Sequence, residues 1–391
     1  MQINEIIKTA VERGASDLHL KVGSHPIIRI NGKLSPMADM KRLMQENTIA
    51  MAFSVMNSKQ KQKFKKNHEI DIAYSVPGVG RFRCNIFQQR GTIGLVLRVI
   101  PVKILSFREL LLPPVLAQIS EETRGLILCT GTTGSGKSTT LAAMIDYVNS
   151  TRVEHIITIE DPIEFLHRDK KSIINQREVE VDTKSFSGAL RSALRQDPDV
   201  ILVGEMRDYE TIETALTAAE TGHLVLSTLH TVDATETINR IISVFPPHQQ
   251  KQIRLQLAGI IKSIISLRLL PKADGAGRVP AVEVMRSTAY MRDCIITPEK
   301  TNMIRDAIAA GVSQYSMQTF DQSLFRLYSD NLITLDTAMR YASNADEFKL
   351  KIQGIESSAD KAREEMEKEM KTGTQEEDVF GDDSPFQFSK L

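Results

Sequence analysis

The chain has 391 residues, of which 41% are hydrophobic and 25% charged, as in globular proteins of two or three domains. Its 49 lysines and arginines balance 49 aspartates and glutamates, so no net positive charge favours binding to nucleic acid. No apolar run approaches the roughly 20 residues that cross a bilayer, and residues 1–5 do not resemble a signal peptide. We expect a cytoplasmic protein without direct membrane insertion and without a nucleic-acid partner.

The three cysteines, Cys84, Cys129 and Cys294, lie far apart in the sequence and among apolar neighbours. Their spacing fits neither a CxxC metal site nor a disulfide framework. We therefore predict that they are small residues of the core.

Residues 1–100 are predicted to form a small α+β domain. The pattern favours an opening helix over residues 3–12, followed by short alternating segments such as 25–30 and 95–100. Asn31-Gly32 lies between two such segments and is typical of a β-hairpin turn.

A linker over residues 101–118, marked by Pro101, Pro113 and Pro114, leads into a second domain over residues 119–345. Strand and helix patterns alternate in this domain, which predicts an α/β fold with a mainly parallel sheet. The expected strands are residues 126–130, 155–159, 200–203 and 224–227. The expected helices follow Lys137, lie near residues 185–195 and begin at Asp208.

The end of the chain is predicted to be helical, with helices over residues 299–310, 319–329, 335–342 and 345–352. Residues 346–391 are expected to form a tail that begins as a helix and ends disordered, because it is acidic and poor in apolar side chains. A solvated tail and a regulatory tether both fit this composition.

Residues 131–138 match the phosphate-binding pattern G-x-x-x-x-G-K-[ST]. The match lies between a predicted buried strand and a predicted helix, where backbone N–H groups and a helix N-terminus face an anion. We predict that this loop binds ATP with Mg²⁺, with Lys137 on the phosphates and Ser138 on the ion. The predicted nucleotide-binding residues here are Gly131, Thr132, Thr133, Gly134, Ser135, Gly136, Lys137, Ser138 and Thr139.

Three carboxylates, Glu160, Asp161 and Glu164, follow the strand expected at residues 155–159. Ligands bind open α/β sheets at the carboxyl ends of the strands, so one of these groups is expected to order magnesium or water. Asp161 precedes a proline in a common turn sequence, so a structural role is equally open for it. We select Glu160 and Glu164 as catalytic residues.

Glu205 ends the apolar strand expected at residues 200–203. A carboxylate beside a phosphate loop in the same sheet can hold magnesium or polarise the attacking water. The alternative is a solvated acid at a strand end. Because Arg207 and Asp208 follow directly, we predict that Glu205 is both a catalytic residue and a magnesium ligand.

Two histidines, His223 and His230, bracket the last strand of the alternating region. Along an extended chain they lie too far apart to share one metal ion. A structural and a functional role are equally open for His223. His230, beside Thr228 and Thr231, is predicted to sense the γ-phosphate.

Four segments together resemble motifs of the secretion ATPase superfamily, and specifically of the type IV pilus retraction (twitching motility) ATPases of the PilT/PilU type. The segments are TGTTGSGKSTT at 130–140, TIEDPIEF at 158–165, RQDPDVILVGEMRD at 195–208 and TAAETGHLVLSTLHT at 217–231. Residues 14–20 and 80–83 are similar to the family's PAS-like first domain, and the resemblance spans about residues 15–345.

The resemblance implies a RecA-like P-loop core, preceded by the PAS-like domain and followed by helices. It also implies a homo-hexamer in which ATP lies between the two domains and is reached by arginines of the first domain or of a neighbouring subunit. Among the candidate arginines we select Arg83 and Arg98 as catalytic. A guanidinium remains charged and binds two phosphate oxygens at once.

The implied function is an ATPase motor that retracts a type IV pilus through an inner-membrane platform protein. Assembly and secretion motors of the superfamily carry a tetracysteine zinc insertion and a further amino-terminal domain, which this sequence lacks. Residues 301–308 match the AIRNLIRE motif of retraction motors only loosely, and the long tail resembles the PilU type. An auxiliary ATP-binding subunit beside a paralogous motor ATPase, and an assembly or secretion ATPase, are the alternatives.

Overall fold

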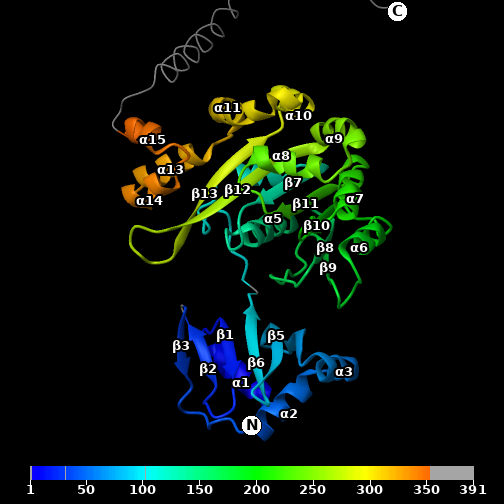
Figure 1. The fold of residues 1–391 in the computed structure, drawn as a ribbon, viewed down its shortest axis with the longest axis vertical. Coiled ribbons are helices and arrows are strands. Elements are labelled where there is room, and N and C mark those ends of the chain that lie inside the picture. The colour runs from blue at the N-terminus through cyan, green and yellow to red at the C-terminus, as the bar shows by residue number, and fades with distance from the viewer. Residues whose placement is uncertain (1, 31, 102, 353–391) are drawn as a thin grey trace, which may run out of the picture. The chain divides into compact units, whose positions relative to one another are not determined.

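The computed structural model describes residues 2–30, 32–101 and 103–352, and Figure 1 shows their helices and strands. Contacts divide the chain into two units. The first unit comprises Met1–Leu269 and Val282–Thr319, and the second comprises Leu270–Ala281 and Phe320–Leu391.

The first unit begins with a six-stranded sheet in the order β3-β2-β1-β6-β5-β4, in which every neighbouring pair is antiparallel. Its strands are β1 (Asp17–Leu20), β2 (Ile27–Ile30), β3 (Lys33–Pro36), β4 (Glu69–Val76), β5 (Gly80–Gln89) and β6 (Thr92–Ile100). The helices of this region are α1 (Ile3–Glu12), α2 (Gln45–Val55) and α3 (Ser58–Asn67). The expected α+β arrangement and the opening helix are confirmed.

Helix α1 buries Ile3, Ile6, Ile7 and Ala10, which recur at the spacing of one helical face. This face joins the core of the first sheet. Between β2 and β3, Ile30 pairs with Lys33 in an antiparallel register. Asn31 of the predicted hairpin turn lies outside the described residues.

A second sheet of the first unit has seven strands in the order β13-β12-β7-β11-β10-β8-β9. The strands are β7 (Gly125–Thr130), β8 (His155–Glu160), β9 (Ile173–Glu178), β10 (Val200–Val203), β11 (Leu224–Leu229), β12 (Ile261–Pro271) and β13 (Arg278–Arg286). The pairings from β12 through β7, β11, β10 and β8 to β9 are all parallel. The prediction of an α/β fold with a mainly parallel sheet is confirmed.

Helices cover both faces of this sheet (Figure 1). The helices of this part of the first unit are α4 (Val115–Ser120), α5 (Lys137–Thr151), α6 (Phe186–Ala193), α7 (Tyr209–Glu220), α8 (Ala234–Ser243), α9 (Pro247–Ile260), α10 (Ala289–Ile296), α11 (Ile304–Ala310) and α12 (Val312–Tyr315). Alternate side chains of β7 enter opposite cores: Leu126 and Leu128 pack on one face, and Ile127 and Cys129 on the other. A strand buried on both faces explains its continuous apolar run.

Three helices that follow strand ends begin at capping residues. The side chains of Ser185, Asp208 and Asp233 accept backbone N–H bonds in the first turns of α6, α7 and α8. Such a cap stabilises a helix by about 1 kcal/mol and fixes where it begins. The starts of α7 and α8 consequently fix the backbone beyond Glu205 and beyond His230.

The second unit contains α13 (Phe320–Ser329), α14 (Leu335–Tyr341) and α15 (Ala345–Ile352). Its core joins Leu270, Val279 and Ala281 to helix residues such as Phe320 and Leu324. These helices match the prediction closely. By contrast, the helix expected over residues 299–310 is divided, with a 3₁₀ segment, η1 (Pro298–Met303), ahead of α11.

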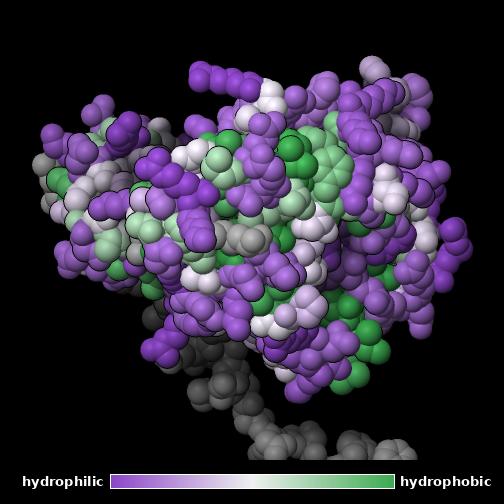
Figure 2. Space-filling model, turned by 90° about the horizontal axis from the view of Figure 1, so that it is seen from below, coloured by the Kyte–Doolittle hydropathy of each residue, from purple (hydrophilic) through white to green (hydrophobic). Residues whose placement is uncertain are grey.

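All three cysteines are buried and free, as predicted. On the face drawn in Figure 2, hydrophilic residues cover most of the surface and hydrophobic residues lie in small groups. Within the described ranges, no helix combines the length and the apolar composition needed to span a bilayer. The predicted domain boundaries at residues 100, 118 and 345 stay a prediction, and the expected disordered end of the tail lies outside the described residues.

Candidate functional site

The phosphate-loop residues 131–136 connect β7 to α5. Gly131, Gly134 and Gly136 have φ values of +141°, +77° and +101°, which side-chain-bearing residues rarely adopt. Gly131 also lies in a crowded position, because a Cβ atom there would lie 2.5 Å from both the Leu267 carbonyl oxygen and the Ser135 hydroxyl. The glycines of the motif are therefore required by the backbone geometry of the loop.

Lys137 is the first residue of α5 and is 8% exposed. Its Nζ donates hydrogen bonds to the carbonyl oxygens of Gly131 (2.8 Å) and Thr132 (3.1 Å). Burial lowers the pKa of Lys137, and the nearby carboxylates of Glu205 and Glu164 partly oppose this effect. The ammonium group therefore lies inside the loop, within the field of two predicted catalytic acids.

The start of α5 is suited to an anion. Its N-cap, Gly136, has no side chain to cap the helix, so Ser138 and Thr139 lie in a first turn without such a cap. The Ser135 hydroxyl in the same loop is buried and has no hydrogen-bond partner among the described residues. A buried lysine, an uncapped helix start and an unpaired hydroxyl fit a bound phosphate group.

Parallel pairing places the predicted site residues at one edge of the second sheet. Thr130 at the end of β7 pairs with Leu229 at the end of β11, and Ser227 of β11 pairs with Val203 at the end of β10. Val203 in turn pairs with Ile159 of β8. The loop, His230, Glu205 and Glu160 therefore follow neighbouring strand ends.

Glu205 is held by two cationic or potentially cationic groups. Arg207 lies 2.8 Å from Glu205 Oε2, and His230 Nε2 lies 3.3 Å from Oε1. Burial raises the pKa of Glu205, but hydrogen bonding and charge from Arg207, together with His230, outweigh burial and leave it below its ordinary value. Glu205 is therefore an ionised carboxylate at neutral pH. Its side chain is 18% exposed.

Glu160 occupies a different environment. Its Oε1 accepts hydrogen bonds from the Thr158 hydroxyl (2.6 Å) and the Gln176 amide (3.1 Å), and its Oε2 accepts one from the Glu164 N–H (3.3 Å). Burial raises its pKa despite these bonds. Glu160 thus fixes the loop that carries Glu164, whereas the Glu164 side chain is exposed and acts on Lys137 through charge.

Arg83 and Arg98 are direct cross-strand partners on β5 and β6. Arg98 forms an ion pair with Asp17 (2.9 Å), and Arg83 lies 3.8 Å from Asp71. Both carboxylates belong to the first sheet, and both arginine side chains are more than half exposed. Within one chain the two selected arginines therefore form a pair on the first sheet, and their catalytic role stays a prediction.

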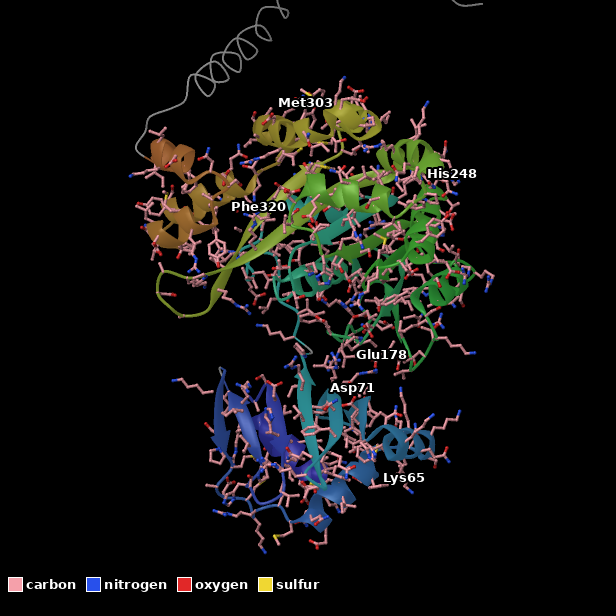
Figure 3. The ribbon with its side chains drawn as sticks, viewed as in Figure 1. Lys65, Asp71, Glu178, His248, Met303 and Phe320 are labelled. Atoms are coloured by element: carbon pink, nitrogen blue, oxygen red, sulfur yellow. The ribbon has the colours of Figure 1, made fainter. Side chains whose placement is uncertain are left out.

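A pocket of the first unit is lined by Asp71 and Arg83 from the first sheet and by Asp161 and Glu178 near the second. Figure 3 labels Asp71 and Glu178. Lys137 is not among the residues that line this pocket, so the pocket and the phosphate loop are separate features.

Sequence reasoning assigned no role to three residues that contribute contacts in the first unit: Arg207, Thr228, and Arg81, which was a candidate arginine that was not selected. Arg207 was noted only as a neighbour, although its position two residues after a strand-end acid was a usable signal. Thr228 donates from its hydroxyl to the Gly204 carbonyl oxygen (2.7 Å), which joins β11 to the Glu205 backbone. Arg81 forms a largely buried ion pair with Glu178 (2.9 Å), and no spacing rule connects two residues so far apart in sequence.

The Nδ1 atom of His223 lies 2.9 Å from the Ala218 carbonyl oxygen, and this contact favours a structural role for the histidine.

In the part of the chain that the structure describes, no group of three or more histidine, cysteine or acidic side chains is arranged to hold a metal ion. A magnesium ion here would depend on hydroxyl and phosphate oxygens besides a carboxylate.

Residues 1–378 match the family model described as "Type II/IV secretion system protein". The chain is 47% identical over 348 residues to the "Type IV pilus retractation ATPase PilT" of Pseudomonas aeruginosa, covering 89% of this chain and 100% of that protein. It is 41% identical over 361 residues to the "Type IV pilus ATPase PilU" of the same organism, covering 92% and 94%.

A solved structure of the pilus retraction motor PilT with bound ADP matches 89% of this chain and 98% of its own. The sequence identity is 51% and the TM-score is 0.82. This likeness agrees with an α/β secretion ATPase fold that has a small amino-terminal domain and further helices. It also agrees with nucleotide binding and with ATPase activity.

Gly131→Ala is expected to weaken ADP binding by at least about tenfold, because the new methyl group meets Leu267 and Ser135. Isothermal titration calorimetry checks this. Gly134→Ala is the matched control, because its φ is also positive but no atom lies within 4 Å of its Cβ. Equal losses in the two variants would show that crowding at Gly131 is not the cause.

Arg207→Ala is expected to move the acid limb of the ATP-turnover profile to higher pH. The reason is that burial, which raises the pKa of Glu205, is then opposed only by His230. Turnover should consequently fall at pH 6 more than at pH 8, whereas Arg207→Lys keeps the charge and most of the parental profile. An unchanged profile in Arg207→Ala would contradict this role for Arg207.

Proposed function

The chain belongs to the type II/IV secretion system protein family, and on that premise we propose that it is an ATP-driven motor that retracts a type IV pilus. One observation carries the proposal most directly: Lys137, Glu205 and His230 meet at one sheet edge in a chain that is 47% identical to a retraction ATPase over that protein's whole length. The fold and the site thus agree on the same class of enzyme.

ATP is the proposed substrate, with its phosphates against the N–H groups of residues 131–138 and against Lys137. The Lys137 ammonium exchanges its two loop-carbonyl hydrogen bonds for phosphate oxygens. Ser138 and Glu205 are the proposed residues for Mg²⁺, directly or through water. When bound, the ion neutralises phosphate charge.

Glu205 is proposed to orient the attacking water. A water-orienting group must be ionised to accept a proton, and the ion pair with Arg207 favours the ionised form. His230 contacts the other carboxylate oxygen, so a change at the γ-phosphate that displaces Glu205 is passed to the loop after β11. This contact supports a sensing role for His230.

Arginines of the first domain are proposed to complete the site in a homo-hexamer, from the same subunit or from its neighbour. Arg83 and Arg98 lie side by side and are more than half exposed. To approach a phosphate, Arg83 gives up a surface ion pair with Asp71, and Arg98 gives up its ion pair with the buried Asp17. Loss of phosphate then removes the charge that holds the two partners together, which opens the interface.

The motor is proposed to act in the cytoplasm on an inner-membrane platform protein of the pilus machine. An assembly or secretion motor is the less favoured alternative, because three cysteines cannot supply a tetracysteine zinc site. The similarity to PilU favours a different alternative, an auxiliary subunit that supports a paralogous retraction ATPase.

Cells that lack this chain are expected to carry excess surface pili when counted by electron microscopy. The parental chain should restore the normal number and Lys137→Ala should not, because the variant lacks the buried ammonium that binds phosphate. Bare cells would contradict retraction and favour an assembly motor. Complementation by Lys137→Ala would favour an auxiliary role that does not depend on hydrolysis.

A further inference from the structure

A buried carboxylate of the second sheet, Glu283, has no part in the proposed mechanism. It lies on β13 and is 5% exposed. Its Oε1 accepts two hydrogen bonds, from the backbone N–H of Ala234 (2.9 Å) and from the hydroxyl of Ser266 (3.3 Å). A buried carboxyl group lowers the stability of the fold unless it is hydrogen-bonded. The two donors satisfy this need, and the segments to which they belong indicate what Glu283 connects.

One donor, the Ser266 hydroxyl, leads to the phosphate loop. Ser266 pairs in register with Thr130, and the Thr130 hydroxyl donates to the Ser266 hydroxyl oxygen (3.0 Å). Both side chains are fully buried. Thr130 is the last residue of β7 and directly precedes Gly131, so this bond fixes the point where the loop begins.

The other donor, the Ala234 N–H, leads to His230. Ala234 is the first residue of α8, and the connection before it is bound to that helix. The Thr231 and Thr237 hydroxyls are 2.6 Å apart, and the Val232 N–H donates to Glu236 (2.8 Å). A displacement of α8 at its start therefore carries along the segment that positions His230.

We propose that Glu283 is a positioning residue that joins the phosphate loop to the His230 segment through Ser266 and the N–H of Ala234. The inference rests on the proposed assignment of those two segments to ATP hydrolysis. The hydrogen bonds of Glu283 hold Lys137 and the Glu205–His230 pair at a fixed position relative to each other during turnover. Such an interaction affects kcat more than nucleotide affinity, because each half of the site remains intact.

The electrostatics agree with a bonded carboxyl group rather than an exposed one. Burial raises the pKa of Glu283 to about 7, and the negative charge of Asp233 adds to this increase. The two hydrogen bonds and the positive charge of Arg268 act in the opposite direction and lower the pKa. Since the folded pKa exceeds the ordinary value, this group lowers folding stability progressively as the pH rises from about 4.5 to 7. Glu283→Gln removes that effect but keeps an acceptor oxygen.

The test measures ATP turnover and ADP affinity of the purified full-length chain. Glu283→Ala is expected to lower kcat about tenfold while the KM for ATP and the affinity for ADP change less than about twofold. Glu283→Gln should keep most of the turnover. Ser266→Ala and Thr130→Val, which each remove one hydroxyl of the path, should lower kcat in the same direction.

The path is tested by combining variants. Thr130→Val should lower kcat in the parental chain but add little to Glu283→Ala, because the link is already broken. Ser263→Ala is the matched control. Ser263 is also a buried serine of β12 that donates to β13, at the Met285 carbonyl oxygen (2.7 Å), but it does not lead to the phosphate loop. This control should lower the melting temperature and leave kcat unchanged.

An unchanged kcat in Glu283→Ala, with a lower melting temperature as in Ser263→Ala, would overturn the inference and leave Glu283 a structural residue. Additive effects of Thr130→Val and Glu283→Ala would also overturn it. If Glu283→Ala does not fold, Ser266→Ala and Thr130→Val decide the question by the same kcat comparison. A parental chain without ATP turnover would instead overturn the proposed function, and this inference with it.

Discussion

The parallel register of β7, β11, β10 and β8 is the constraint on which the rest of the site depends. Strand ends that are paired within one sheet cannot move apart without loss of the ladder hydrogen bonds between them. Glu160 ends β8, Glu205 and His230 come just after β10 and β11, and Lys137 begins the helix that follows the loop after β7. Cores on both faces of the sheet hold it rigid, and capped helices fix the chain that leaves each strand. The proposed site therefore lies at an edge whose shape the core determines.

Charge is distributed unevenly over this edge, and that difference separates the roles of its acids. Glu205 is paired with Arg207 and stays ionised. Glu160 is surrounded by neutral donors, so burial dominates and raises its pKa. Among the described residues, no carboxylate lies in hydrogen-bonding contact with Lys137, which instead donates to loop carbonyl oxygens that a phosphate group can replace. The pKa values of these two glutamates are thus shifted in opposite directions because their neighbours differ.

Local patterns predicted much of this structure. The phosphate loop, β10 and the starts of α6 and α7 were found because apolar runs, glycines and capping residues are local signals. Strand β12 was missed because α9 runs directly into it, without a proline or a polar turn at the boundary. Strand β9 carries alternating polar residues of an edge and has little apolar signal. Glu283 was missed because its partners come from β12 and α8, and the sequence does not show which distant segments meet.

The most direct test of the account is phosphate release by the purified chain, compared with its Glu205→Ala variant. The parental chain is expected to release phosphate steadily, and the variant is expected to release it at least about a hundredfold more slowly. The variant should retain its affinity for ADP because the phosphate loop is intact. A variant that released phosphate at near the parental rate would contradict the assignment of Glu205. The reaction would then depend on another group at the strand edge.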